Sequence, residues 1–406
     1  MPSSRSADAL FLRLTLADGR TATLRLGEAS TVLAVDDALV SSWDLVGRPY
    51  ALVRETGTYR RGLDGRLLWK CEATAGGPRL RRRLPADEGG PIVEAARAEA
   101  GLALAALAAL AGSPAEARRR LLQVVAMDDA ALRLDAGRFR AASGPVGILP
   151  PDQYLALVVR VTEGCSWNAC TFCSLYRDMP FRWKGPGELL AHVAALRAYF
   201  GRSIALRRSV FLGDANALCL THERLLPLVE IVARELPGRP LFSFLDAWTG
   251  QRKTANEWRD CARLGLRRVY LGLETGDPAL LAWLGKPGAP RDAVDLVASL
   301  REAGIAAGVI VLLGAGGERF AAAHALGTAE TLSAMRLGPD DLVCFSEYVD
   351  EPGLAYGGGA TDAPDLRPLS ADRDAEVRRA ILDAFRPADP ARPPRSATYD
   401  LREFVY

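Results

Sequence analysis

The stretch that decides the fold is "TEGCSWNACTFCSLYRD", residues 162–178, in which three cysteines are spaced C-x4-C-x2-C. Cys165, Cys170 and Cys173 lie on residues 164–186, a segment without helical or strand periodicity that we name the cysteine loop. A loop of this length is uncommon in a compact domain unless it has a function. Because the chain has an odd number of cysteines, seven, the clustered thiols indicate metal ligation and not a disulfide framework.

The cysteine loop follows the first of six apolar, β-branched runs, each of which precedes an amphipathic helical segment. The runs are "LALVVRV", "SVFLG", "PLFSFLD", "RVYLGLE", "GVIVLLG" and "LVCFSEYV". This alternation predicts an α/β domain over residues 151–350, with a parallel sheet covered by helices. Six βα units fit an open, partial barrel or a doubly wound sheet, and in both of these folds ligands bind at the C-terminal strand ends.

The region before this domain has a different pattern. Residues 1–90 alternate apolar and polar positions around Asp18-Gly19 and Asp64-Gly65, which predicts a small antiparallel β-rich domain. Within it, residues 75–91 are Gly/Pro-rich and basic, which is typical of a linker. Residues 91–150 are predicted to form a helical connector with helices at 92–112 and 114–125, the second of them capped by Ser113.

The region after residue 350 is predicted to be a C-terminal extension, residues 351–406, that packs on the barrel. It begins with the Pro/Gly-rich "EPGLAYGGGATDAPDLRP" and has one helical segment at 370–385. Its aromatic end, "SATYDLREFVY", favours docking onto the body of the protein.

Composition excludes several classes of function. The chain has 406 residues, 49% of them hydrophobic, and a formal net charge of only +2, so no global field attracts it to nucleic acid or to a membrane surface. Neither a signal-peptide apolar region nor 18 consecutive apolar residues occur. We therefore expect a soluble, cytoplasmic protein without a membrane partner.

Two metal sites are compatible with three clustered thiols. A structural zinc ion needs four closed ligands, so Cys219, Cys261 or Cys344 would have to supply the fourth. A [4Fe–4S] cubane held by three thiolates has one iron with an open position, where a small molecule can bind the metal directly. The residues alone leave both sites open.

The stretch "GCSWNACTFC" resembles the cluster loop of the radical S-adenosylmethionine (radical SAM) superfamily. The usual spacing there is C-x3-C-x2-C, and this chain has one additional residue between its first two cysteines. The resemblance implies that Cys165, Cys170 and Cys173 bind a [4Fe–4S] cluster whose fourth iron is chelated by S-adenosylmethionine. Phe172 matches the aromatic residue that members of the superfamily place beside the adenine.

Three further segments resemble the superfamily at the ends of later strands. "FLGDANAL", residues 211–218, resembles the "GGE" segment that holds the methionine ammonium, with Gly213 and Asp214 at the matching positions. "YLGLETGDPALLAWLGK", residues 270–286, resembles the fourth-strand segment, in which Glu274 would contact the ribose hydroxyls or the methionine amine and Thr275 would also bind the cofactor. "VIVLLGAGGE", residues 309–318, resembles the segment that lies along adenine and contains Gly314 and Glu318.

The resemblance implies an enzyme that cleaves S-adenosylmethionine by one-electron reduction to a 5′-deoxyadenosyl radical, which abstracts hydrogen from a small-molecule substrate. A flavodoxin or ferredoxin would donate the electron. The catalytic candidates are Asp246, Glu347 and Tyr348, and the two carboxylates would otherwise pair with nearby arginines. Further pocket residues are expected at the strand ends and in the cysteine loop: Ser243, Trp248, Ser346, Tyr176, Arg177 and Arg182.

Two other functions compete with this interpretation. A radical SAM enzyme that modifies RNA would grip phosphates with arginines of the first 120 residues, namely Arg79, Arg81, Arg82, Arg83 and Arg118–Arg120. A non-enzymatic iron–sulfur electron carrier or sensor would hold the cluster without cleaving S-adenosylmethionine. The N-terminal region contains no histidine, which disfavours a histidine-ligated cobalamin domain and hence a cobalamin-dependent methylase.

Overall fold

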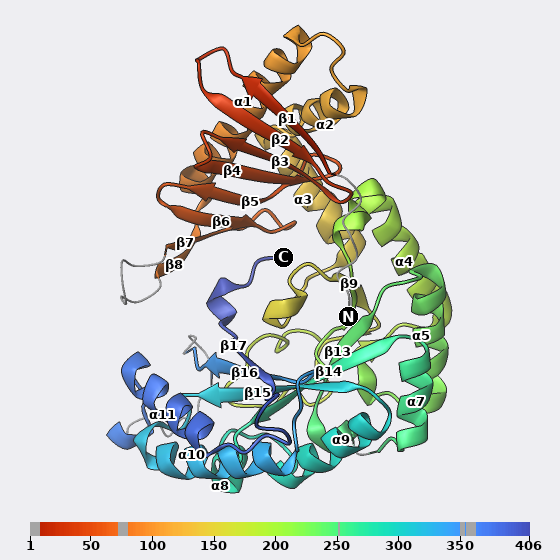
Figure 1. The fold of residues 1–406 in the computed structure, drawn as a ribbon. Helices are drawn as coiled ribbons and strands as arrows, with labels where there is room; N and C mark the ends of the chain where they lie inside the picture. Colours follow the sequence, from red (N-terminus) through yellow and green to blue (C-terminus); the bar gives the residue numbers. More distant parts are fainter. Residues whose placement is uncertain (1–8, 72–79, 251, 350–353, 355–362) are drawn as a thin grey trace. The chain divides into compact units, whose positions relative to one another are not determined.

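The computed structural model describes residues 9–71, 80–250, 252–349, 354 and 363–406, which form two compact units (Figure 1). The first unit comprises Met1–Pro145, Ala194–Arg208 and Arg402–Tyr406, and the second comprises Val146–Val193 and Ser209–Leu401. The predicted fold class is confirmed, since a parallel α/β sheet follows an antiparallel N-terminal sheet. The finer division of the chain at residues 90, 150 and 350 stays a prediction.

The first unit contains an eight-stranded antiparallel sheet in which neighbours in sequence are also neighbours in the sheet. Alternate residues of the central strands are buried, as a half-covered antiparallel sheet requires. Their apolar face packs against small residues of two helices, including Ala96, Ala100 and Ala117. The strands are β1 (Leu10–Thr15), β2 (Thr21–Leu26), β3 (Ser30–Val35), β4 (Leu39–Asp44), β5 (Pro49–Arg54), β6 (Gly57–Arg61), β7 (Leu67–Cys71) and β8 (Leu80–Leu84).

The predicted linker at residues 75–91 is wrong where the structure describes it, and residues 72–79 lie outside the described part. Residues 80–84 form β8, which pairs with β7, and a helix already begins at Ala86. The arginine-rich sequence "LRRRL" suits this position because charged side chains are tolerated on a strand with one unpaired edge.

Three helices follow this sheet: α1 (Ala86–Ala109), α2 (Ala115–Ala126) and α3 (Asp129–Ser143). The two predicted helices are confirmed, although α1 begins six residues before its predicted start at residue 92. Ser113 is not the cap of α2, because Pro114 takes that position without a side-chain hydrogen bond. Helix α3 was not predicted, and it begins where the Asp128 side chain accepts a hydrogen bond from the Ala131 N–H.

The second unit is built on a seven-stranded parallel sheet with the order β17-β16-β15-β14-β13-β12-β9. Six of these strands correspond to the predicted apolar runs. The seventh, β17, is short, polar and mostly exposed, so it carries no apolar run from which to predict it. The strands are β9 (Leu157–Arg160), β12 (Val210–Gly213), β13 (Leu241–Leu245), β14 (Leu266–Glu274), β15 (Ala306–Leu313), β16 (Leu342–Glu347) and β17 (Arg395–Thr398).

Helices cover one face of this sheet (Figure 1). In β15, Val309, Val311 and Leu313 pack with helical residues, whereas Ile310 and Leu312 face a cavity on the other side. The sheet is therefore a partial barrel whose inner face is available to ligands. The helices are α4 (Pro186–Phe200), α5 (His222–Glu235), α6 (Ala247–Gly250), α7 (Ala255–Arg263), α8 (Pro278–Trp283), α9 (Pro290–Glu302), α10 (Gly317–Ala334) and α11 (Ala371–Ala384).

The ends of the cysteine loop are joined by a small antiparallel pair, β10 (Thr162–Glu163) and β11 (Arg182–Trp183). The aromatic C-terminus is buried, with Tyr399, Phe404 and Tyr406 each at most 4% exposed. The prediction that the whole extension packs on the barrel is wrong for Arg402–Tyr406, which belong to the first unit. Among the described residues, none of the helices combines the length and the apolar character that a membrane span requires.

Candidate functional site

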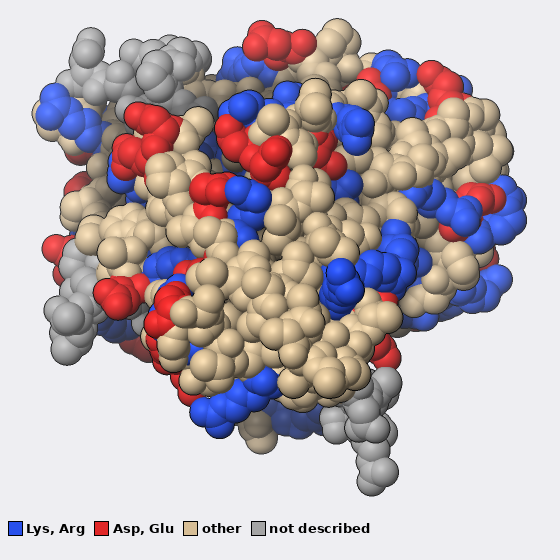
Figure 2. All heavy atoms as spheres, turned by 90° about the horizontal axis from the view of Figure 1, so that it is seen from above, with Lys and Arg blue, Asp and Glu red and all other residues tan. Residues whose placement is uncertain are grey.

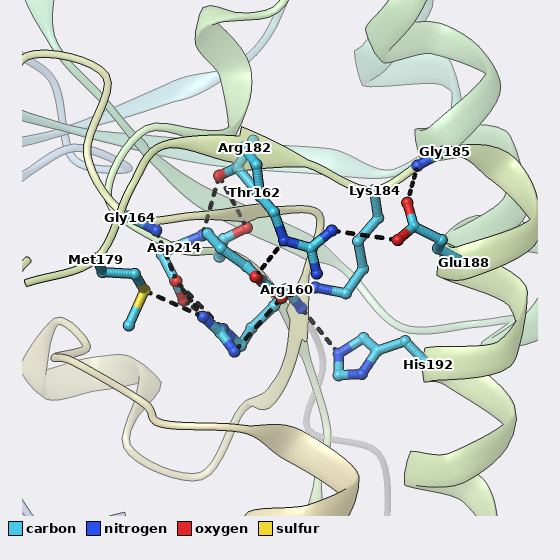
Figure 3. Close-up of polar contacts among 12 residues, drawn as sticks. Arg160, Thr162, Gly164, Met179, Arg182, Lys184, Gly185, Glu188, His192 and Asp214 are labelled. Atoms are coloured by element: carbon cyan, nitrogen blue, oxygen red, sulfur yellow. Dashed lines mark hydrogen bonds and ion pairs between the residues drawn. The ribbon is translucent and has the colours of Figure 1, made fainter.

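The start of the cysteine loop is held by a buried ion pair (Figure 3). Arg160, at the end of β9, donates from Nε and Nη2 to the carboxylate of Asp214 at 3.0 and 2.9 Å. The same carboxylate accepts a hydrogen bond from the backbone N–H of Gly164, the residue before Cys165, at 3.2 Å. Asp214 was predicted to bind the methionine ammonium, but its oxygens are directed to Arg160 and Gly164 and it does not line the cavity.

A second ion-pair group ties the two ends of the loop together. Glu163 of β10 accepts hydrogen bonds from Arg182 at 2.6 Å and from Lys184. Burial raises the pKa of Glu163, but these two cations outweigh it and lower the value to about 2. The predicted pocket residue Arg182 therefore belongs to the base of the loop, where it also donates to Glu188, and does not line the cavity (Figure 3).

The three clustered cysteines line one cavity of about 230 Å³ in the second unit. The loop that carries them is internally hydrogen-bonded: the Asn168 N–H donates to Cys165 Sγ at 3.4 Å. Arg177 donates to the carbonyl oxygens of Cys173 and Cys170 at 3.0 and 2.8 Å, so this predicted pocket residue stabilises the loop from outside. The sequence-predicted ligand set is thus brought together at the strand ends.

The chemistry of these thiols fits an iron–sulfur cluster. Burial raises the pKa of the Cys170 thiol to about 12 and also raises the pKa of Cys173. Such thiols lose their protons when a cation replaces them. Among the described residues, no three His, Cys, Asp or Glu side chains are placed to share a single metal ion. A cubane needs no such convergence, because each of its thiolates binds a different iron atom.

Glu274 lines the same cavity and forms a buried ion pair. Its carboxylate accepts from Lys286 Nζ at 2.6 Å, and the two side chains are 9% and 12% exposed. Glu274 has a φ of +60°, and the pairing of β14 with β15 shifts register there. Such departures from regular strand geometry are common at functional sites. Burial lowers the pKa of Lys286, but Glu274 and Cys170 outweigh it, so the net shift is upward and the ammonium stays charged.

Asp246 lies at the end of β13 and lines the cavity with neutral partners. Its carboxylate accepts from the Thr249 N–H and hydroxyl at 2.9 and 2.6 Å, and from the Asn216 amide. The expected alternative, an arginine partner, is not what the structure shows. Asn216 also donates to Ser166 of the cysteine loop at 2.8 Å, so this group connects the strand ends to the thiols.

Phe172 and Tyr348 lie in one apolar group beside the cavity. Both pack against a buried cluster that includes Leu280 and Leu312. Phe172 precedes Cys173 directly, so a planar group held against this wall would also lie close to the thiols. The cavity further includes Glu347 and three of the expected pocket residues, Tyr176, Trp248 and Ser346.

Several predicted cofactor residues do not line the cavity. Gly213 ends β12, and its carbonyl accepts a hydrogen bond from Thr162 at 3.3 Å. Thr275 is fully buried, where it contacts His324 Nδ1 at 2.8 Å and accepts from the Asp277 N–H. Glu318 is exposed and paired with Arg373. The expected pocket residue Ser243 is buried and donates to the Leu212 carbonyl.

Gly314, also predicted to bind cofactor, lies against a buried carboxyl of α11. A side chain at Gly314 would begin 3.0 Å from Asp374 Oδ1, an atom without a hydrogen-bond partner among the described residues. Asp374 is 7% exposed. Burial and the neighbouring Glu347 raise the pKa of Asp374 from 3.8 to about 7.

This shift makes the stability of the protein depend on pH. The pKa of Asp374 is higher in the folded protein than in the unfolded chain, so the folded state is favoured while Asp374 is protonated. This stability is lost as pH rises from about 4 to about 7. Asp374→Asn is therefore expected to raise the free energy of unfolding at pH 8 by up to about 4 kcal/mol, with little change at pH 4. Urea unfolding at both pH values measures this, with exposed Asp372→Asn as control. Equal effects of Asp374→Asn at pH 4 and pH 8 would contradict it.

Sequence reasoning missed several cavity residues, among them Asn216, Lys286 and Tyr399. Asn216 and Lys286 both lie inside segments that resemble the superfamily, but the pattern of that resemblance rests on the acidic residues Asp214 and Glu274. Tyr399 comes from the segment after β17 and carries no local signal, because only the tertiary fold brings it to the cavity.

The second unit is therefore a partial parallel barrel with three thiols at its strand ends. Residues 159–324 match the family model described as the Radical SAM superfamily. This part of the chain belongs to that superfamily, whose enzymes use a [4Fe–4S] cluster and S-adenosylmethionine as cofactors.

Individual proteins are similar over parts of their length. An uncharacterized methyltransferase of Pyrococcus horikoshii is 25% identical over 169 residues, which are 39% of this chain, and the match spans about a third (34%) of that relative. Methylornithine synthase is 17% identical with a TM-score of 0.41, over 62% of this chain and 67% of that one. The methyltransferase TsrM from Kitasatospora setae, with cobalamin and a [4Fe–4S] cluster bound, is 16% identical with a TM-score of 0.43, over 59% and 54%.

Proposed function

We propose that this radical SAM enzyme abstracts hydrogen from a small, largely apolar molecule that is neutral or positively charged. The observation that carries the proposal is the composition of the cavity. Besides the thiols, its wall is mainly aliphatic and aromatic, with Phe244, Tyr270 and Tyr399 among its residues. Such a wall suits an organic small molecule, whose burial supplies binding energy and keeps water from a reactive radical.

The cofactors enter this proposal through residues that fit them. Cys165, Cys170 and Cys173 would hold the cluster, and Phe172 would lie beside the adenine. When bound and reduced, the cluster and S-adenosylmethionine together supply a 5′-deoxyadenosyl radical as the hydrogen-abstracting agent. The chain itself orients the substrate and excludes water, and Asp246, Glu347 and Tyr348 are the lining residues with groups able to bind or move a proton.

The charges of the cavity support the substrate class. Lys286 is the one Lys or Arg among the described lining residues, and Glu274 already neutralises it. Asp246 and Glu347 add negative charge. A buried phosphate or carboxylate needs a cation beside it, so this wall disfavours anionic substrates.

Several of the arginines that would bind RNA phosphates are instead paired with carboxylates of this chain. Arg82 donates to Glu88 at 2.9 and 2.6 Å, and Arg119 and Arg120 both pair with Glu116. On the face drawn in Figure 2, Lys and Arg side chains are interspersed with Asp and Glu. Arg79 lies outside the described residues. We therefore prefer a metabolite to a nucleic acid, with a cytoplasmic flavodoxin or ferredoxin as the proposed electron donor.

Activity-guided fractionation tests this function. The reconstituted enzyme is incubated anaerobically with dithionite, S-adenosylmethionine and cell-extract fractions separated by charge, and 5′-deoxyadenosine is measured. We expect stimulation by a neutral or cationic small-molecule fraction, insensitive to ribonuclease. Stimulation confined to anionic or ribonuclease-sensitive fractions would overturn the substrate class, and cleavage absent from every fraction would support the electron-carrier alternative. The Cys170→Ala protein is the blank for each fraction.

A further inference from the structure

The turn after α8 packs directly on the cysteine loop. The Thr171 N–H donates to the Leu284 carbonyl at 2.9 Å, and the Trp167 indole N–H donates to the Gly285 carbonyl at 2.9 Å. Gly285 has a φ of +67°, and a side chain there would begin 3.3 Å from the Ala169 carbonyl oxygen. Because Ala169 and Thr171 flank Cys170, this turn is fixed against the middle cysteine of the loop.

The next residue of the turn, Lys286, extends into the same cavity and meets Glu274. Their ion pair is built into the strand beneath it: a side chain at Gly272 would overlap the Glu274 carboxylate and begin 2.5 Å from Lys286 Nζ. A larger residue at this position would displace the two charged ends from where they meet, so Gly272 leaves room for the pair. Both charged groups line the same cavity as Cys170, and the turn that carries Lys286 is hydrogen-bonded to the cysteine loop.

We propose that Lys286 and Glu274 form an opposed charge pair that sets the reduction potential of the cluster, an inference that rests on the proposed cysteine ligands. Reduction adds one negative charge to the cluster. A nearby ammonium stabilises that charge and raises the potential, while a nearby carboxylate lowers it, and both effects are strong where water is excluded. Lys286 and Glu274 are thus positioning residues for electron uptake, acting through the field at the cluster.

Redox titration of the reconstituted protein tests the pair. The reduced-cluster EPR signal is followed against potential in the absence of S-adenosylmethionine, so that contacts with the cofactor do not contribute. We expect Lys286→Met to shift the midpoint to a more negative potential and Glu274→Gln to shift it to a more positive one. The double variant, which removes both charges, should return close to the wild-type value. Arg291→Met, which removes one solvent-exposed positive charge outside the cavity lining, should leave the midpoint nearly unchanged.

Several outcomes overturn the proposal. A Lys286→Met midpoint equal to that of the wild type, with unchanged iron content and spectrum, excludes a role for the ammonium. If Lys286→Met instead loses its iron, Glu274→Gln still decides, because an unshifted midpoint there excludes the opposed pair. A merely structural role would change iron retention and leave the potential of the retained cluster unchanged. Absence of a cluster from the wild-type protein would contradict the proposed function as a whole.

Discussion

Replacement of Cys170 by alanine is expected to abolish assembly of the cluster. Anaerobic reconstitution of the wild-type protein should give about four irons and four sulfides per chain, and the variant should retain less than about one. The reason is geometric, because Cys170 lies between the other two thiols in the loop and lines the same cavity with them. Iron and sulfide analysis with the visible absorption spectrum measures this result, and 5′-deoxyadenosine formation should disappear together with the cluster.

Cys219 provides the matched control for this experiment. It is a half-buried thiol without a disulfide partner, and it does not line the cavity. Cys219→Ala should therefore keep its iron and its spectrum. Loss of metal in Cys219→Ala, or zinc bound in place of iron in the wild type, would instead favour a four-ligand site. Retained iron with an unchanged spectrum in Cys170→Ala would remove the ligand assignment.

Replacement of Arg160 by methionine is expected to produce the largest loss of stability. Its guanidinium and the Asp214 carboxylate are 7% and 4% exposed, so the substitution leaves a buried carboxylate without its cation. Breaking such a pair from one side costs about 3–5 kcal/mol. Urea unfolding under anaerobic conditions, followed by far-UV circular dichroism, measures this cost. Because Asp214 also holds Gly164, iron retention should fall as well.

Two further variants separate the causes of this loss. The double variant Arg160→Met with Asp214→Leu removes both charges and should recover much of the stability, since no buried charge then lacks its partner. Arg182→Met removes an exposed arginine from the same network and should cost less than about 1 kcal/mol. If Arg160→Met and Arg182→Met destabilised the protein equally, the account of the buried pair would be wrong.

The sequence predicts most of the fold because periodicity is a local signal. Apolar runs such as residues 308–314 alternate with amphipathic helices, and each run predicted a strand of the parallel sheet. Elements without such a signal were missed. Strand β17 is polar and mostly exposed, and β8 is an edge strand whose arginines are typical of a linker. Both form because a neighbouring strand offers an unpaired edge, which is a tertiary condition.

The candidate site is predicted in part for the same reason. The three cysteines are close in sequence, so their meeting at the cavity follows from local spacing and from the position of the loop at a strand end. The role of Asp214 depends on Arg160, a residue 54 positions earlier, and no local pattern indicates that pairing. The ion pair between Lys286 and Glu274 was likewise not predicted, because it depends on the path of the chain after α8.

The central claim is that three thiolates leave one iron of a cubane open to S-adenosylmethionine. EPR spectra of the dithionite-reduced protein, recorded with and without S-adenosylmethionine, test it most directly. The account predicts a [4Fe–4S]⁺ signal whose g-values change when S-adenosylmethionine is added, because the cofactor binds the open iron. A signal that is identical in both samples would contradict it.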